Sequence, residues 1–296
     1  MRFAYVLGIC GFAIVGTPAG AQDVDWKKVD EAIGRSAAVV SGDVHRYTFP
    51  RADLNVTLDG VTIRPALALG GWTAFKPMHG GAMIMGDLVL LETEINPVMS
   101  KLIESGGEIT AVHNHLLRGN PETFYMHVGG HGDPVKLATA IHTALAASKT
   151  PLAPPTPPAT QPTIDLDTSQ LDQIMGVKGQ ANGGVYQFGV PRRDPISENG
   201  MQMSPAGPLG LATGIGFQAT GGGKAAITGD FVLAAEEVNP VIQTLRANGI
   251  EVTALHSHML MEQPRLFFMH FWANDDALKL ARGLRAALDK TASAKS

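Results

Sequence analysis

Residues 86–98 form the stretch GDLVLLETEINPV, and residues 229–241 form GDFVLAAEEVNPV, the same pattern written again 143 positions later. The same offset relates FYMH at 124–127 to FFMH at 267–270, and KLATAIHTAL to KLARGLRAAL. An offset of this length is far above the roughly 20 to 50 residues that separate the units of a solenoid. The sequence therefore predicts one domain that has been duplicated within the chain.

A proline-rich segment separates the two copies. Residues 147–164, ASKTPLAPPTPPATQPTI, contain six prolines and no periodic apolar face, which is typical of an extended, semi-rigid spacer. The chain has 296 residues, enough for two domains that each bury a core. We expect a signal peptide, a first repeat domain, a linker and a second repeat domain, with the bounds 1–21, 22–148, 149–164 and 165–290.

The N-terminal residues have the pattern of a secretory signal peptide. Arg2 is followed by an apolar stretch over 3–15 and by small residues that end at Ala21, so we expect cleavage after Ala21 and a periplasmic or secreted protein. The apolar stretch is too short for a permanent transmembrane helix. Cys10, the one cysteine of the chain, lies inside this segment, so the mature chain has no thiol for a disulfide or a metal.

The composition excludes several kinds of partner. Charged residues make up 17% of the chain, the formal net charge is -4, and Lys and Arg form no cluster. This balance gives no electrostatic basis for binding nucleic acid or an anionic membrane. The expected partner is a small or neutral molecule.

Each repeat has a readable order of elements. The first is expected to contain strands around 43–49 and 71–76, and then a core of strand, helix, strand, strand and helix over 82–92, 97–105, 108–117, 123–130 and 134–147. In this reading Asn96 caps the first helix with Pro97 at its first position, and Asp133 opens the second. The order predicts an α+β fold in which helices pack on one face of a mainly antiparallel sheet.

Two histidine triplets carry the clearest chemistry. ITAVHNHLL at 109–117 and VTALHSHML at 252–260 each place two histidines one residue apart, and a third histidine follows in the next strand; the six are His113, His115, His127, His256, His258 and His270. Alternation along a strand puts His113 and His115 on one face. An antiparallel register in which paired residue numbers give an even sum, near 240, would bring His127 within about 4.5 to 7 Å of them.

Three neutral imidazoles on a rigid sheet suit a transition metal. Zn is the first expectation, with Cu, Ni or Fe(II) as alternatives, and one such site is expected in each repeat. His131 is a candidate fourth ligand in the first repeat, where the second has Asn274. Glu122, whose counterpart is Arg265, is a candidate carboxylate ligand or general base for a metal-dependent hydrolase.

Other interpretations stay open at this stage. The histidines also fit a catalytic or ligand-binding patch without metal, or a structural layer of hydrogen-bonded histidines between the domains of a non-catalytic binding or metal-handling module. Asp87 and Asp230 are expected to orient an imidazole or to lie near a helix N-terminus. Arg51 and Arg192 fit either an anionic ligand or a salt bridge, and Met259 either a soft ligand or a core residue.

The motifs PRADL, LGGWTAF, GDLVLLETEINPV, ITAVHNHLL and MHVGGHGDP resemble the bacterial LppY/LpqO family over most of both halves. This resemblance implies an exported protein that carries a domain of unknown function, and it implies no settled activity. The namesakes of the family are lipoproteins. This sequence departs from them, because Ile9 is large where a lipoprotein signal has a small residue before its cysteine.

Overall fold

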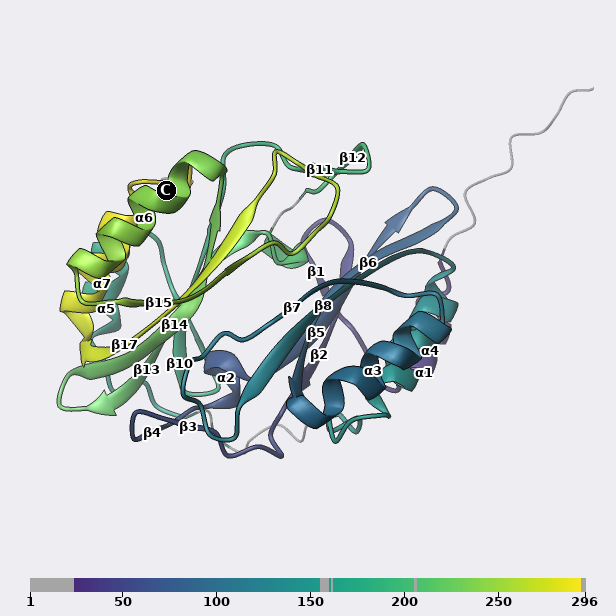
Figure 1. Cartoon of the computed structure of the whole chain (residues 1–296), viewed down its shortest axis with the longest axis horizontal. Helices are drawn as coiled ribbons and strands as arrows, with labels where there is room; N and C mark the ends of the chain where they lie inside the picture. Colours follow the sequence, from purple (N-terminus) through teal and green to yellow (C-terminus); the bar gives the residue numbers. More distant parts are fainter. Residues whose placement is uncertain (1–23, 155–159, 161, 205–206, 294–296) are drawn as a thin grey trace, which may run out of the picture.

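The computed structural model describes residues 24–154, 160, 162–204 and 207–293. The predicted signal peptide and Cys10 lie outside the described residues. Figure 1 shows two sheet-rich lobes side by side, each with its long helices on the side turned away from the other lobe, and with the short helix α2 between them. The two lobes are the two repeats, so the expected duplicated α+β fold is confirmed.

The first repeat is built around a six-stranded antiparallel sheet. Its strand order is β1 (Ala38–Val40), β2 (Val44–Pro50), β5 (Gly70–Met78), β6 (Gly81–Leu91), β8 (Thr123–Gly132) and β7 (Glu108–His113). Its helices are α1 (Trp26–Ile33), α3 (Glu92–Glu104) and α4 (Pro134–Leu145). The segment between β2 and β5 forms β3 (Thr57–Leu58), β4 (Val61–Thr62) and the short helix α2 (Pro65–Ala68).

The second repeat follows the same plan. Its sheet has the order β9 (Gln180–Asn182), β10 (Val185–Pro191), β13 (Ala212–Gly221), β14 (Lys224–Leu233), β17 (Phe267–Asp276) and β15 (Glu251–His256). Its helices are α5 (Thr168–Met175), α6 (Ala235–Ala247) and α7 (Ala277–Leu288). The segment between β10 and β13 holds β11 (Ser197–Glu198), β12 (Met201–Gln202) and the 3-10 turn η1 (Gly207–Leu209), and β16 (Glu262–Gln263) pairs with β11.

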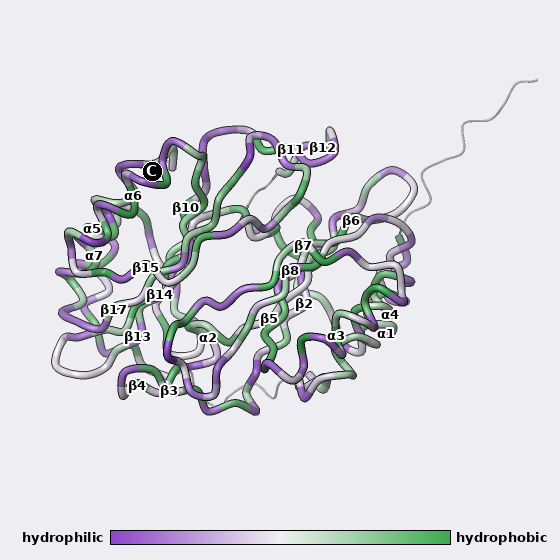
Figure 2. The backbone as a smooth tube through the Cα atoms, in the orientation of Figure 1, coloured by the Kyte–Doolittle hydropathy of each residue, from purple (hydrophilic) through white to green (hydrophobic). Residues whose placement is uncertain are grey.

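Each sheet has its main apolar core on the face that carries the helices. In the first repeat Met126 and Val128 are buried against α3 and α4, as the alternation in β8 predicts. The equivalent residues Met269 and Phe271 are buried in the second repeat. Figure 2 shows hydrophobic stretches along the strands, with hydrophilic residues recurring along the outer helices. No helix among the described residues has both the length and the apolar character needed to cross a bilayer.

Helix α3 begins five residues earlier than expected. It runs from Glu92, so Pro97 lies inside the helix and Asn96 does not cap it. The helix starts here because Oε2 of Glu94 accepts a hydrogen bond from the N–H of Leu91, at 2.9 Å, which satisfies a donor that a helix N-terminus leaves free. Helix α6 repeats this arrangement with Glu237.

A buried arginine fastens the start of each of these helices. Arg51 has no exposed surface, and its guanidinium donates to Glu94 at 2.7 Å and to Asp53 at 2.9 Å. Arg192 contacts Glu237 and Asp194 in the same way. The salt-bridge interpretation of the two arginines is therefore confirmed.

The repeats pack against each other through reciprocal hydrogen bonds. Nη1 of Arg46 donates to the carbonyl of Pro208 at 2.7 Å, and Nε2 of Gln187, which holds the equivalent place in β10, donates to the carbonyl of Ala66 at 2.7 Å. The two segments that precede β5 and β13 thus each reach across to the other repeat. This exchange gives the chain an approximate internal two-fold axis between the sheets.

A second reciprocal pair lies at the edge strands β7 and β15. Thr110 donates its hydroxyl to the carbonyl of His258 at 2.6 Å, and Thr253 donates to the carbonyl of His115 at 2.6 Å. Both acceptors belong to the histidine triplets. The packing of the two repeats therefore fixes the backbone of the triplets in relation to each other.

Candidate metal centre

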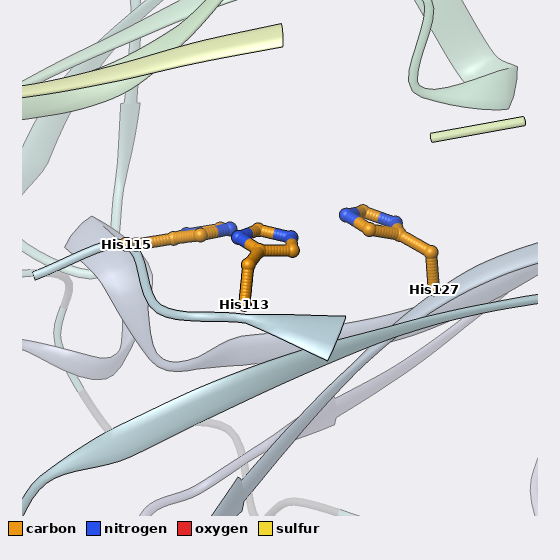
Figure 3. Close-up of side chains that lie close together, drawn as sticks. All are labelled: His113, His115 and His127. Atoms are coloured by element: carbon orange, nitrogen blue, oxygen red, sulfur yellow. The ribbon is translucent and has the colours of Figure 1, made fainter. Parts of the chain in front are cut away.

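The strands that carry the triplets pair in an even register. His113 lies opposite Tyr125 and Ala111 lies opposite His127, so the paired numbers sum to 238. The even register is confirmed beyond the irregularity between Ile109 and Ala111, and its sum is close to the expected 240, but His113 pairs with Tyr125 and not directly with His127. Strand β7 ends at His113, so His115 lies in the loop beyond it. His113 and His127 are diagonal neighbours, and their ring centroids are 5.0 Å apart. Figure 3 shows their rings on the same side of the sheet, with His115 beside them.

The two triplets face each other across the contact between the repeats and form one cluster. Equivalent residues differ by 143 in number, and His113 stacks on its own equivalent, which places this pair on the internal axis. The ring centroids are 3.4 Å apart for His113 and His256, 3.6 Å for His115 and His270, and 3.8 Å for His127 and His258. We call these six residues the histidine cluster. The sequence predicts one site in each repeat, and the structure joins the two triplets instead.

Two aspartates, Asp87 buried and Asp230 half-buried, lie beside the cluster. Asp87 on β6 lies opposite His127, and Asp230 on β14 lies opposite His270. Oδ2 of Asp230 is 3.4 Å from Nε2 of His258. Each aspartate therefore lies beside an imidazole, where it can orient the ring, and not at a helix N-terminus. These were the two places that the sequence allowed.

Burial keeps the histidines neutral. It lowers the pKa of His113 to about 4 and that of His270 to about 3, and the other four histidine pKa values are lowered by burial and by the neighbouring imidazoles. Burial raises the pKa of Asp87 to about 7, although the charge of Arg46 opposes this shift. The pKa of Asp230 is raised by burial and by Asp87. At neutral pH the imidazole lone pairs are thus free to bind a cation.

Most of the imidazole nitrogens of the cluster make no hydrogen bond. Among the described residues, the buried atoms without a hydrogen bond include Nε2 of all six histidines, Nδ1 of His256, and Oδ1 of Asp87 and Asp230. In His270 the Nδ1 lies 2.8 Å from the carbonyl of Gly229, which assigns its proton to Nδ1 and leaves the Nε2 lone pair available. Each buried polar atom left unpaired costs about 1 to 3 kcal/mol. A hydrogen-bonded histidine layer would not leave so many.

The unpaired atoms are close enough to share an ion. Atoms that could ligate a metal, one from each residue, lie within 4.8 Å of one another in four overlapping groups. These are His113 with His115 and His127, His113 with His256 and His270, His127 with His256 and His258, and Asp230 with His258 and His270. Two of these groups draw on both repeats. The geometry accordingly fits a metal centre that the repeats build together.

Two predicted ligands do not join the cluster. His131 is exposed near the end of β8, where it lies opposite Met83, four residues and about 13 Å of strand beyond His127. Glu122 is exposed in the loop before β8. Met259 is buried in an apolar cluster that includes Phe268, so it packs as a core residue.

A cavity of about 890 Å³ opens beside the histidine cluster. Asp87, His115, Asp230 and His270 are among its lining residues, and so is Tyr125, whose ring stacks on His115 at a centroid distance of 3.3 Å. No local pattern of the sequence indicates this cavity, because its lining comes from several strands of both repeats. A ligand in the cavity would have direct access to the cluster.

The fold and the cluster define a duplicated α+β protein with a shared histidine centre. Residues 27–147 and 169–290 each match the family described as Domain of Unknown Function (DUF1259), and the chain belongs to that family. No curated protein matches the chain.

Two solved structures are similar to this chain at low level. One is a trimeric bacterial microcompartment shell protein, PduB, with 14% identity, a TM-score of 0.20, and coverage of 86% of this chain and 91% of that chain. The other is EtuB from Clostridium kluyveri, with 10% identity, a TM-score of 0.20, and coverage of 86% and 89%.

Proposed function

We propose that the chain binds a transition-metal ion at the histidine cluster, with ligands from both repeats. The observation that carries this proposal is the set of buried imidazole nitrogens that face one another without partners. Retaining such atoms in a folded protein is costly unless something pairs with them. A cation that accepts several neutral imidazoles at once removes this cost.

The donor set favours Zn, with Cu, Ni and Fe(II) as alternatives. Imidazole suits all four metals, and a nearby carboxylate completes a mixed nitrogen and oxygen shell. The ligands we propose are drawn from the six histidines, in groups of three whose ligand atoms lie within 4.8 Å of one another, with Asp87 or Asp230 as a carboxylate ligand or as a group that orients an imidazole. His131 and Glu122 are left out of this set because both are exposed away from the cluster.

The cavity favours a second, catalytic function. A catalytic metal keeps an open position beside a concave pocket, whereas a storage site closes its shell. Here Asp87, Asp230 and two histidines of the cluster line the cavity. We propose that a metal held by the histidines would polarise water beside these residues for hydrolysis, and that the carboxyl of Asp87, which lies opposite His127, would be placed to accept the proton.

The site of action that we propose is outside the cytoplasm. The N-terminal pattern and the resemblance to the LppY/LpqO family both support an exported protein. The mature chain is expected to begin at Gln22. An intact mass measured on protein recovered from the periplasm or the medium tests this, and retention of Met1 to Ala21 or a lipid on Cys10 contradicts it.

Metal analysis of the purified, untagged chain tests the main proposal. We expect stoichiometric metal, and a gain of about 2.7 kcal/mol in the free energy of unfolding when the free metal is a hundred times its Kd. Chelator should reverse the gain. If the protein holds no stoichiometric metal, and its Tm is the same with Zn, Cu, Ni or chelator, the histidine layer between the repeats becomes the better account.

A further inference from the structure

The residue paired with Asp87 on the neighbouring strand differs from the residue paired with Asp230. Trp72 on β5 lies opposite Asp87, whereas Gly214 on β13 lies opposite Asp230. One strand further out, Gly189 on β10 is paired with Gly214. The sheet of the second repeat is therefore reduced to bare backbone beside the metal centre, and both glycines line the cavity.

Neither glycine is required by its backbone or by its neighbours. A Cβ added at Gly189 or at Gly214 would meet no atom within 4 Å, and neither residue adopts a positive φ. Gly229 is different, because a Cβ there would lie 2.0 Å from the carbonyl oxygen of Gly214. What Gly189 and Gly214 provide is open space, which points to a ligand that occupies it.

A cation lines the same cavity. The guanidinium of Arg46 is half-buried, lies 3.8 Å from the ring centroid of Trp72, and donates one hydrogen bond, to Pro208. A guanidinium has five N–H donors, so this bond uses a minority of them. The equivalent residue Gln187 makes the same kind of bond, to Ala66, without a charge. The positive charge of Arg46 is thus more than the contact between the repeats requires.

We infer that the cavity is the ligand pocket of the metal centre and that it takes a small organic carboxylate. The carboxylate pairs with the guanidinium of Arg46, the body of the molecule lies on the floor formed by Gly189 and Gly214, and its other end points towards Asp230. A planar guanidinium matches a carboxylate with two parallel hydrogen bonds. The volume of about 890 Å³ is within the range of pockets for small organic ligands.

This inference rests on the proposed metal centre, because the charge of the cavity depends on it. Asp87 and Asp230 line the cavity and would repel an anion if they were ionised and unpaired. A divalent metal bound to neutral imidazoles offsets those charges, and Arg46 then leaves the cavity with a net attraction for an anion. Lys178, exposed at the lining, adds to this field.

Calorimetric titration of the metal-loaded full chain with benzoate tests the pocket, with benzamide as the neutral probe of the same shape. We expect benzoate to bind at least about tenfold more tightly than benzamide, since a charged pair is worth more than one factor of ten in a partly buried site. Equal affinity of the two probes, or no binding of benzoate, overturns the inference. The metal content of the same sample, measured separately, reports on the proposed function.

Two variants assign the effect, and the chain supplies the template for each. Arg46→Gln copies Gln187 and keeps a donor for Pro208, while Gly214→Trp copies Trp72 and fills the cavity. Each should lower the affinity for benzoate at least about tenfold and leave the metal content unchanged. Arg193→Gln, which removes an exposed charge away from the cavity, is the matched control and should bind benzoate as the wild type does.

The outcomes separate the two proposals. Wild-type affinity for benzoate in both variants, with metal retained, overturns the pocket and leaves the metal centre in place. A variant that loses metal together with benzoate acts through the centre and overturns the assignment to Arg46 or to the glycine floor. A wild-type chain without metal overturns the proposed function itself.

Discussion

The two repeats keep one set of residues and differ in another, and the two sets lie in different places. The histidines, the aspartates and the buried arginines occur at equivalent positions in both copies. Several differences lie at the cavity, where Arg46 and Trp72 of the first repeat are replaced by Gln187 and Gly214 at the equivalent positions of the second. The histidine pair on the internal axis is the same in both copies. The residues paired with the two aspartates beside it differ between the copies. The structure thus separates a histidine cluster built by both repeats from a cavity whose lining differs between them.

The largest effect on stability is expected where the repeats agree. Arg51→Leu and Arg192→Leu should each lower the free energy of unfolding by about 3 to 5 kcal/mol, because each leaves a buried glutamate without its partner. Urea unfolding measures the loss, and Arg193→Leu on the surface is the control. A loss below about 1 kcal/mol in either repeat would show that the buried pair does not hold that repeat together.

The two reciprocal substitutions Trp72→Gly and Gly214→Trp should have unequal effects on the free energy of unfolding. Trp72→Gly is expected to destabilise by about 3 kcal/mol, because the ring packs against Gly210 and under Arg46. Gly214→Trp should change the stability by less than about 1 kcal/mol, since its side chain enters the existing cavity. Thermal and urea unfolding of both variants compare them. A strong loss in Gly214→Trp would mean that the cavity is not open space in solution.

The metal-free protein should lose stability in acid. The folded pKa of His113 is about 4, against about 6.5 when unfolded, so the unfolded chain binds the extra proton as the pH falls through this window. Each such histidine then removes up to about 1.4 kcal/mol per pH unit. The raised pKa of Asp87 acts in the opposite direction between about 4 and 7, but the six histidines outnumber the two aspartates. Urea unfolding between pH 7 and 4.5 measures the slope; stability that rises in acid would contradict the neutral cluster.

The smallest effect concerns the reciprocal threonines. Thr110→Val and Thr253→Val should each cost about 1 kcal/mol, the usual value of one hydrogen bond between partly buried groups. The two losses should be equal within error, because the bonds are equivalent about the internal axis. Unequal losses would indicate that the two edge strands are not held alike.

Much of the fold was predictable, because it depends on local patterns. Repetition of one motif at a fixed offset indicates the duplication, and alternation in β8 places Met126 in the core and His127 on the other face. The start of α3 was not predictable from Asn96 and Pro97. That start depends on Arg51, which lies 43 positions before Glu94 and fixes the capping carboxylate.

The candidate site was half predictable for a similar reason. The parity of β7 and β8 brings His113 and His127 to one face of one sheet, but nothing in either strand says what that face meets. The union of the triplets depends on contacts between residues about 140 positions apart, such as His113 with His256. The cavity depends on Gly189 and Gly214, which are neighbours only through strand pairing.

The claim that one centre serves both repeats is tested most directly by Co(II) titration of the wild type, His113→Ala and His256→Ala. The visible absorption of bound Co(II) and its affinity are measured for each chain. We predict that each single substitution raises the Kd for all of the bound Co(II) about 100-fold or more. The double variant should raise the Kd little further than either single variant, because the two rings stack on the axis of one cluster. If each variant instead loses half of the absorption and keeps the other half at wild-type affinity, the repeats hold two independent sites and the shared centre is wrong.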